Sequence, residues 1–167
     1  MLTAMYVDVE NPKSRELLQT FEEDVPFIIL SGGEIKHGNI THYLDFSEEL
    51  LKILSEGETL IRPLQAKGIK ILLSIKGGNG GVSFGSLWNT TLQKAFAQEC
   101  CYACWLYGFD GVEFYDMEGD NPHQSPYPGV QYMTNMLIYL VEMFDKQISF
   151  APPILIRETG YGKYISL

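Results

Sequence analysis

Long hydrophobic runs, a targeting segment and clustered positive charge are all missing from this 167-residue chain. No apolar run approaches the roughly 20 residues that a bilayer-spanning helix needs. The N-terminus enters a strand-like run at once, without a charged region followed by an apolar signal core. We therefore expect this chain to be soluble and to have no membrane partner.

Basic residues are scarce as well. The chain has 12 Lys and Arg residues against 21 Asp and Glu residues, which gives a formal net charge of −9. The basic residues are spread singly, so no basic stripe exists to neutralise phosphates, and nucleic acid is not an expected partner. The glycine-rich segment 76–81 lacks the GxxxxGK[ST] spacing and is not predicted to cradle phosphates.

Cysteine is limited to three residues, Cys100, Cys101 and Cys104, which all lie in one segment with a helical pattern. An odd count without partners elsewhere argues against a disulfide framework, and no second ligand pair at zinc spacing accompanies them. We expect three buried thiols on a core helix, and neither a metal nor another cofactor.

What the sequence does contain is an alternation of apolar, strand-length runs with helical patterns. Strands are expected at 3–9, 25–30, 69–75, 111–116 and 147–151, and helices at 13–21, 47–64, 90–107 and 130–144. The residues after 30 are expected to form a loop, and 154–167 show no clear period. Strands apolar enough to be covered on both faces predict a parallel sheet with right-handed crossovers. The residues alone leave two α/β alternatives, a doubly wound sheet or part of a barrel, within a single domain over 1–167.

The most informative segment is 106–119, which combines a helix end, a tight turn, a short apolar strand and an acidic strand end. Apolar and polar residues alternate along the strand, and two acids follow where it stops: Val112, Glu113, Phe114, Tyr115, Asp116 and Glu118. Acids at the carboxyl end of a parallel strand occupy the usual catalytic position of β/α folds.

Residues 107–118, Tyr-Gly-Phe-Asp-Gly-Val-Glu-Phe-Tyr-Asp-Met-Glu, resemble the DGxDxDxE signature of glycoside hydrolase family 18, especially its bacterial endo-β-N-acetylglucosaminidases. Residues 61–77 resemble the third strand of those enzymes with its lead-in helix, and 4–10 and 43–46 fit the same order. The resemblance covers the whole chain. It implies a (β/α)8 TIM-barrel type that is incomplete here, with about five β/α units in an open parallel sheet.

The resemblance also implies a chemistry. Family 18 enzymes retain configuration because the sugar's own N-acetyl oxygen attacks the anomeric carbon, while an Asp orients the acetamide and a Glu protonates the leaving oxygen. The implied ligand is an N-acetylglucosamine-containing oligosaccharide or glycoprotein glycan, with no cofactor. The family further implies a secreted, periplasmic or cell-surface bacterial protein.

This sequence departs from the signature at the acids themselves. Aligned without a gap, Glu113 and Tyr115 replace the two inward Asp residues, and Met117 falls on the proton donor. A one-residue bulge at Tyr115 would restore the D-x-E spacing and turn Asp116 and Glu118 inward, as the acetamide-orienting group and the catalytic acid. The alternative is that these two acids only solvate a strand end.

Five further residues are predicted to contact the substrate: Glu10 at the end of the first strand, Asn79 in the glycine-rich loop, Trp88, Glu113 and Tyr115. For Asn79 and Trp88 the alternative is a loop residue and a packed helix start.

We therefore expect an endo-β-N-acetylglucosaminidase-like chain, directed at N-acetylglucosamine-containing glycans, with impaired or absent hydrolysis. The alternatives are a catalytically silent glycan-binding module and a truncated fragment without function. An open sheet leaves its first and last strands without neighbours, so self-association through these edges is also expected.

Overall fold

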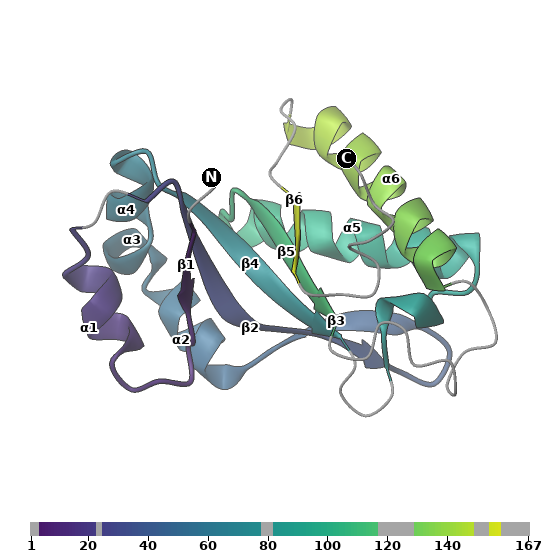
Figure 1. The fold of residues 1–167 in the computed structure, drawn as a ribbon, viewed down its shortest axis with the longest axis horizontal. Helices are drawn as coiled ribbons and strands as arrows, with labels where there is room; N and C mark the ends of the chain where they lie inside the picture. Colours follow the sequence, from purple (N-terminus) through teal and green to yellow (C-terminus); the bar gives the residue numbers. More distant parts are fainter. Residues whose placement is uncertain (1–3, 23–24, 78–81, 117–128, 149–153, 158–167) are drawn as a thin grey trace.

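The computed structural model describes residues 4–22, 25–77, 82–116, 129–148 and 154–157, which form one six-stranded sheet and its covering helices (Figure 1). Five strands are parallel and hydrogen-bonded in the order β1 (Ala4–Val7), β2 (Phe27–His37), β4 (Lys70–Gly77), β5 (Gly111–Asp116) and β6 (Ile154–Arg157). The predicted open parallel sheet is confirmed. Neighbouring strands follow one another along the chain, as in a β/α barrel.

The helices are α1 (Ser14–Gln19), α2 (Glu48–Ser55), α3 (Gly57–Leu60), α4 (Arg62–Ala66), α5 (Thr90–Tyr107) and α6 (Gly129–Ile148), with a 3₁₀ turn, η2, at Phe84–Ser86. The helix expected over 47–64 is therefore three short helices. Pro63 lies in the first turn of α4, where its missing N–H costs nothing, and so it starts a new helix rather than continuing the old one.

The hydrophobic core lies between one face of the sheet and these helices. Val112 and Phe114 of β5 are fully buried on that face, and the Phe114 ring packs edge-on against Phe84 with centroids 5.2 Å apart. The three cysteines of α5 are buried thiols, as predicted. Burial raises the pKa of Cys100 and of Cys104, which keeps both thiols protonated.

The start of the strand predicted at 147–151 is wrong, because Gln147 and Ile148 belong to helix α6. Residues 149–151 lie outside the described residues, and β6 is described at Ile154–Arg157. The buried stripe of α6 includes Leu140 and Phe144, and Ile148 follows Phe144 at the same four-residue spacing. A helical period that extends one turn further explains the error.

The loop predicted after residue 30 is also wrong, because β2 does not stop at Gly33. The pairing of β2 with β4 shifts register between Leu30 and Gly33, and β2 then continues to His37. Its extension pairs antiparallel with β3 (His42–Phe46). Gly32 has a φ of +107°, a conformation that L side chains rarely adopt, so this glycine permits a bulge rather than a strand end.

No helix in the described ranges is long and apolar enough to cross a membrane.

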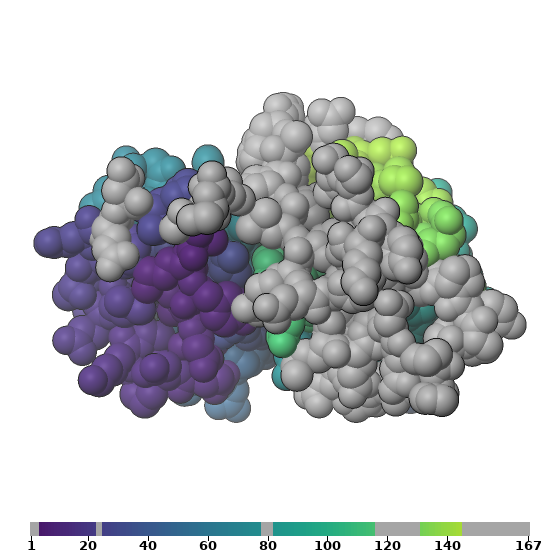
Figure 2. Space-filling model, viewed as in Figure 1, coloured from purple at the N-terminus to yellow at the C-terminus, as the bar shows by residue number. Residues whose placement is uncertain are grey.

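In the space-filling view, β1 and α1 form the purple part of the surface (Figure 2).

Candidate functional site

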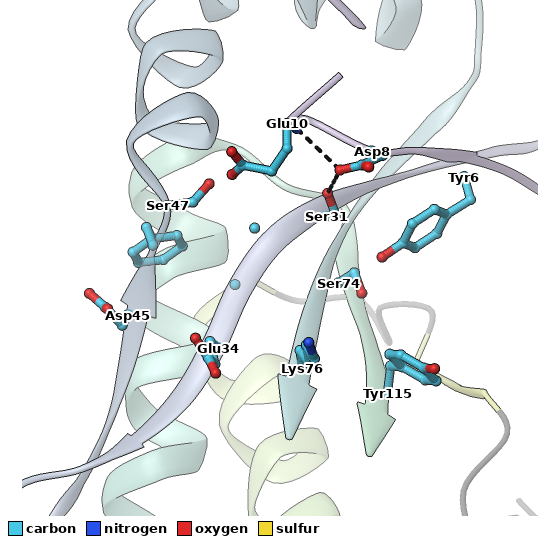
Figure 3. Close-up of a pocket in the computed structure, with 13 residues that line it drawn as sticks. Tyr6, Asp8, Glu10, Ser31, Glu34, Asp45, Ser47, Ser74, Lys76 and Tyr115 are labelled. Atoms are coloured by element: carbon cyan, nitrogen blue, oxygen red, sulfur yellow. Dashed lines mark hydrogen bonds between the residues drawn. The ribbon is translucent and has the colours of Figure 1, made fainter. Parts of the chain in front are cut away.

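A cavity of about 400 Å³ opens at the carboxyl ends of the central strands. Residues from the end of β1, from β2, β4 and β5, and from β3 all line it, and Figure 3 shows their side chains. The carboxyl ends of parallel strands meet at one edge of a sheet, which is where β/α barrels carry their functional groups. This cavity is therefore the candidate site.

The end of β1 is fixed by a small hydrogen-bond network. The Oδ1 atom of Asp8 accepts hydrogen bonds from the Glu10 amide at 3.1 Å and from the Ser31 hydroxyl at 3.3 Å. The Ser31 hydroxyl in turn accepts from the Val9 amide at 3.0 Å. These bonds hold the chain in a turn that keeps Asp8 and Glu10 at the cavity, as drawn in Figure 3.

Strand pairing places a row of three polar residues across the site. Glu34 of β2 pairs with Lys76 of β4, and Lys76 pairs with Tyr115 of β5. All three line the cavity. Because alternate residues of a strand share a face, the row beneath them on β4 and β5 consists of Ser74 and Glu113.

Glu113 is predicted to contact substrate, but it lies below the cavity surface. It is only 1% exposed and is not a lining residue, whereas its partner Ser74 is. The Ser74 hydroxyl donates a hydrogen bond to Oε2 of Glu113. Glu113 thus orients a hydroxyl that the cavity does reach.

Of the other predicted residues, Glu10 and Tyr115 line the cavity. Trp88 does not. It follows η2, where Phe84 and Leu87 turn into the core, and its side chain is 63% exposed. Asn79 lies outside the described residues.

The acidic end of β5 is described only up to Asp116, whose backbone pairs with Gly77, and Met117 and Glu118 lie outside the described residues. The pairing of β5 with β4 is regular from Gly111 to Asp116, with no register shift. The bulge at Tyr115 that would turn Asp116 inward is therefore absent from the paired strand.

Three lining residues that the sequence did not single out are Glu34, Asp45 and Lys76. The first two lie on the β2–β3 hairpin, which the sequence predicts as a loop. Lys76 follows the apolar run predicted as a strand at 69–75. Its position two residues after Ser74 could have indicated that both side chains lie on the same face of that strand. Within the described ranges, no group of three or more His, Cys, Asp or Glu residues is placed to hold a metal ion.

A second polar cluster fixes the hairpin beside the site. His42 is 3% exposed, its Nε2 lies 2.8 Å from the Ser86 hydroxyl, and its ring meets that of His37 with centroids 4.8 Å apart. Burial, with a smaller contribution from His37, lowers the pKa of His42 to about 4. The imidazole is therefore neutral at neutral pH.

We expect this histidine to make stability depend on pH. The folded-state pKa lies below the ordinary 6.5, so between pH 6.5 and about 4 the unfolded chain binds the proton more readily. The stability that the neutral His42 side chain contributes to the folded state is fully present above pH 6.5. The free energy of unfolding then decreases by at most about 3 kcal/mol as the pH falls to about 4. Urea unfolding of wild type and His42→Gln across this range measures it. An equal pH slope in both proteins would contradict the assignment.

An open parallel sheet of β/α units, with an acid-lined cavity at the strand ends, gives the chain the architecture of a partial β/α barrel. No family model matches the chain. It is 34% identical over 106 residues to endo-β-N-acetylglucosaminidase F1 from Elizabethkingia meningoseptica, a match that covers 62% of this chain and 30% of that protein. An endo-β-N-acetylglucosaminidase from a Flavobacterium species is 35% identical, with 34% of its length covered. The chain thus spans about a third of the length of the curated relatives it matches.

Solved structures share the fold. A chitinase from Bacteroides thetaiotaomicron superimposes with a TM-score of 0.69 and 18% identity, over 95% of this chain and 48% of that one. Bacteroides thetaiotamicron EndoBT-3987, solved with a Man5GlcNAc product, gives 0.66 at 18% identity, over 100% of this chain and 40% of that one. The partial sequence matches and the fold together make this chain similar to the endo-β-N-acetylglucosaminidases and chitinases of glycoside hydrolase family 18, as its sequence predicted.

Proposed function

We propose that this domain recognises N-acetylglucosamine-containing glycans in the cavity at the strand ends and hydrolyses them slowly or not at all. The observation that carries the proposal is the cavity itself, which collects carboxylates, hydroxyls and tyrosines at the usual functional edge of a β/α barrel. Sugars are bound by hydrogen bonds from such groups, and aromatic rings such as Tyr6 and Tyr115 offer faces for the apolar side of a sugar.

Within this proposal, Glu10 and Tyr115 contact the glycan directly, and Glu113 acts through the hydroxyl of Ser74. Trp88 is a proposed contact for parts of a glycan that extend beyond the cavity. Asn79, which lies outside the described residues, is also a proposed contact. Among the described lining residues, several carboxylates face a single ammonium group, that of Lys76, so a neutral oligosaccharide suits the cavity better than a sialylated or sulfated one.

Binding is the first quantity to measure. We expect calorimetric titration with N,N′-diacetylchitobiose or a high-mannose N-glycan to show saturable binding that weakens by about tenfold or more in Tyr115→Ala, because that variant removes a ring from the cavity wall. Tyr102→Ala, which removes an exposed tyrosine on α5 that is not a lining residue, is the matched control. Absence of binding to both ligands would contradict the proposal.

The proposal includes two cases, a slow hydrolase and a catalytically silent glycan-binding module, and the identity to endo-β-N-acetylglucosaminidases favours the slow hydrolase. If the chain is an enzyme, Glu118 is the proposed acid and Asp116 the proposed acetamide-orienting group. Release of free glycan from a high-mannose glycoprotein separates the two, since only an enzyme produces it.

A further inference from the structure

Within the row formed by Glu34, Lys76 and Tyr115, the first two residues have hydrogen-bonding capacity that the described protein groups do not use. Lys76 is half-buried at the cavity and makes no hydrogen bond or ion pair with any described residue. One carboxylate oxygen of Glu34, Oε2, forms an ion pair with Lys36 at 2.6 Å. The other, Oε1, is buried and has no partner among the described residues.

The side chains of Glu34 and Lys76 are neighbours, but they do not form a hydrogen bond or an ion pair with each other. Glu34 and Lys76 are directly paired across adjacent parallel strands, yet no ion pair joins them within 4.0 Å. A buried carboxylate oxygen without a hydrogen bond costs folding free energy, and the half-buried ammonium group of Lys76 also needs hydrogen-bond acceptors. The side-chain hydrogen bond with Glu34 raises the pKa of Lys36.

The charges around the row restrict what can occupy it. A second anion would meet Glu34 together with Asp8, Glu10 and Asp45, whereas a second cation would meet the ammonium of Lys76. A neutral ligand that offers a donor and an acceptor side by side satisfies both groups without adding charge. Adjacent oxygen atoms of a sugar ring have this arrangement.

We propose that Glu34 and Lys76 form a specificity-determining pair that holds two neighbouring oxygen atoms of one neutral hexopyranose ring. A ring hydroxyl donates to the carboxylate of Glu34, whose side chain lines the cavity, and the adjacent hydroxyl or acetamide oxygen accepts from Nζ of Lys76. Tyr115, next in the row, lines the same wall of the cavity. This inference rests on the glycan-binding function proposed above and assigns the contacts that select the sugar.

Titration calorimetry with N,N′-diacetylchitobiose and with a Man5GlcNAc oligosaccharide tests the pair, using wild type, Lys76→Met, Glu34→Gln and the double variant. We expect each single variant to bind the better ligand about ten- to a hundredfold more weakly, which is the usual effect of losing a hydrogen bond to a charged group. Because both side chains hold the same ring, the double variant should lose less than the product of the two single losses.

Two variants serve as controls. Lys70→Met makes the same substitution on the same strand at its opposite end, where Lys70 meets Asp110, and should bind as wild type does. Lys36→Met removes the ion pair with Glu34 but keeps the Oε1 atom, and should stay within about threefold of wild type. Thermal unfolding of each variant checks that the fold persists.

Three results would overturn the inference. Wild-type affinity in Lys76→Met and Glu34→Gln would remove the proposed contacts while leaving the glycan-binding function in place. An equal loss in Lys70→Met would show a general effect of altering β4. Failure of the wild-type protein to bind either sugar would overturn both this inference and the function on which it rests.

Discussion

Gly32→Ala is expected to destabilise the fold by about 3–5 kcal/mol and, with it, to remove the cavity. Gly32 has a φ of +107°, and holding an L-residue in such a region costs on the order of 1–3 kcal/mol. The new Cβ would also lie 2.8 Å from the Cβ of Leu50 and 2.9 Å from the Ser47 hydroxyl oxygen. Overpacking of this kind adds about 1–3 kcal/mol, because neither neighbour is the free end of a flexible side chain.

The effect should spread, because Gly32 connects the bulge of β2 to the start of α2. The Gly32 carbonyl accepts a hydrogen bond from the Ser47 amide at 2.8 Å, and the Ser47 hydroxyl caps α2 by accepting from the Leu50 amide at 3.2 Å. A displaced Ser47 would lose this cap, which typically contributes about 1 kcal/mol.

Urea unfolding measures the change, and Gly68→Ala is the matched control. Gly68 also has a positive φ, +88°, but nothing lies within 4 Å of the position that a Cβ atom would take there. It should therefore show only the backbone cost, about 1–2 kcal/mol. Equal destabilisation in the two variants would contradict the prediction that close packing around Gly32 adds to the loss of stability in Gly32→Ala.

The same glycine explains why the sequence predicted the sheet but missed the hairpin. The strand at 69–75 was readable as a continuous apolar run of strand length, and the strand at 111–116 as an alternation of apolar and polar residues between turn signals. The sequence around Gly32 and Gly33 carries an equally clear turn signal, yet β2 crosses it as a bulge and pairs onward with β3. Only the packing of α2 against this bulge distinguishes the two outcomes, and that contact joins residues far apart in the sequence.

The site divides in a similar way. Glu10 and Tyr115 were predictable because both lie at or near the end of a recognisable strand. Glu34 was hidden in the supposed loop, and the importance of Lys76 depends on its pairing with Glu34 and Tyr115. Side-chain rows across a sheet require strand order and register, which a single sequence does not specify.

The remaining prediction concerns turnover. We expect this chain to release glycan from a high-mannose glycoprotein at least about 10²–10⁴-fold more slowly than endo-β-N-acetylglucosaminidase F1 assayed alongside it, which is the usual contribution of a general acid. In the ungapped alignment the proton-donor position holds Met117, a thioether that has no proton to give. The regular pairing of β5 through Asp116 supports that alignment over the bulged one.

Variants of the two acids decide between the alignments. Under the ungapped alignment, Glu118→Gln and Asp116→Asn should leave both the residual release rate and glycan affinity unchanged, because neither residue takes part in proton transfer. Glu58→Gln, a change at an exposed glutamate of α3, is the control for loss of one carboxylate. If release is readily measured in wild type and Glu58→Gln but disappears in Glu118→Gln with affinity retained, then Glu118 is the acid. The strand must in that case bulge when glycan binds, and the domain is an enzyme.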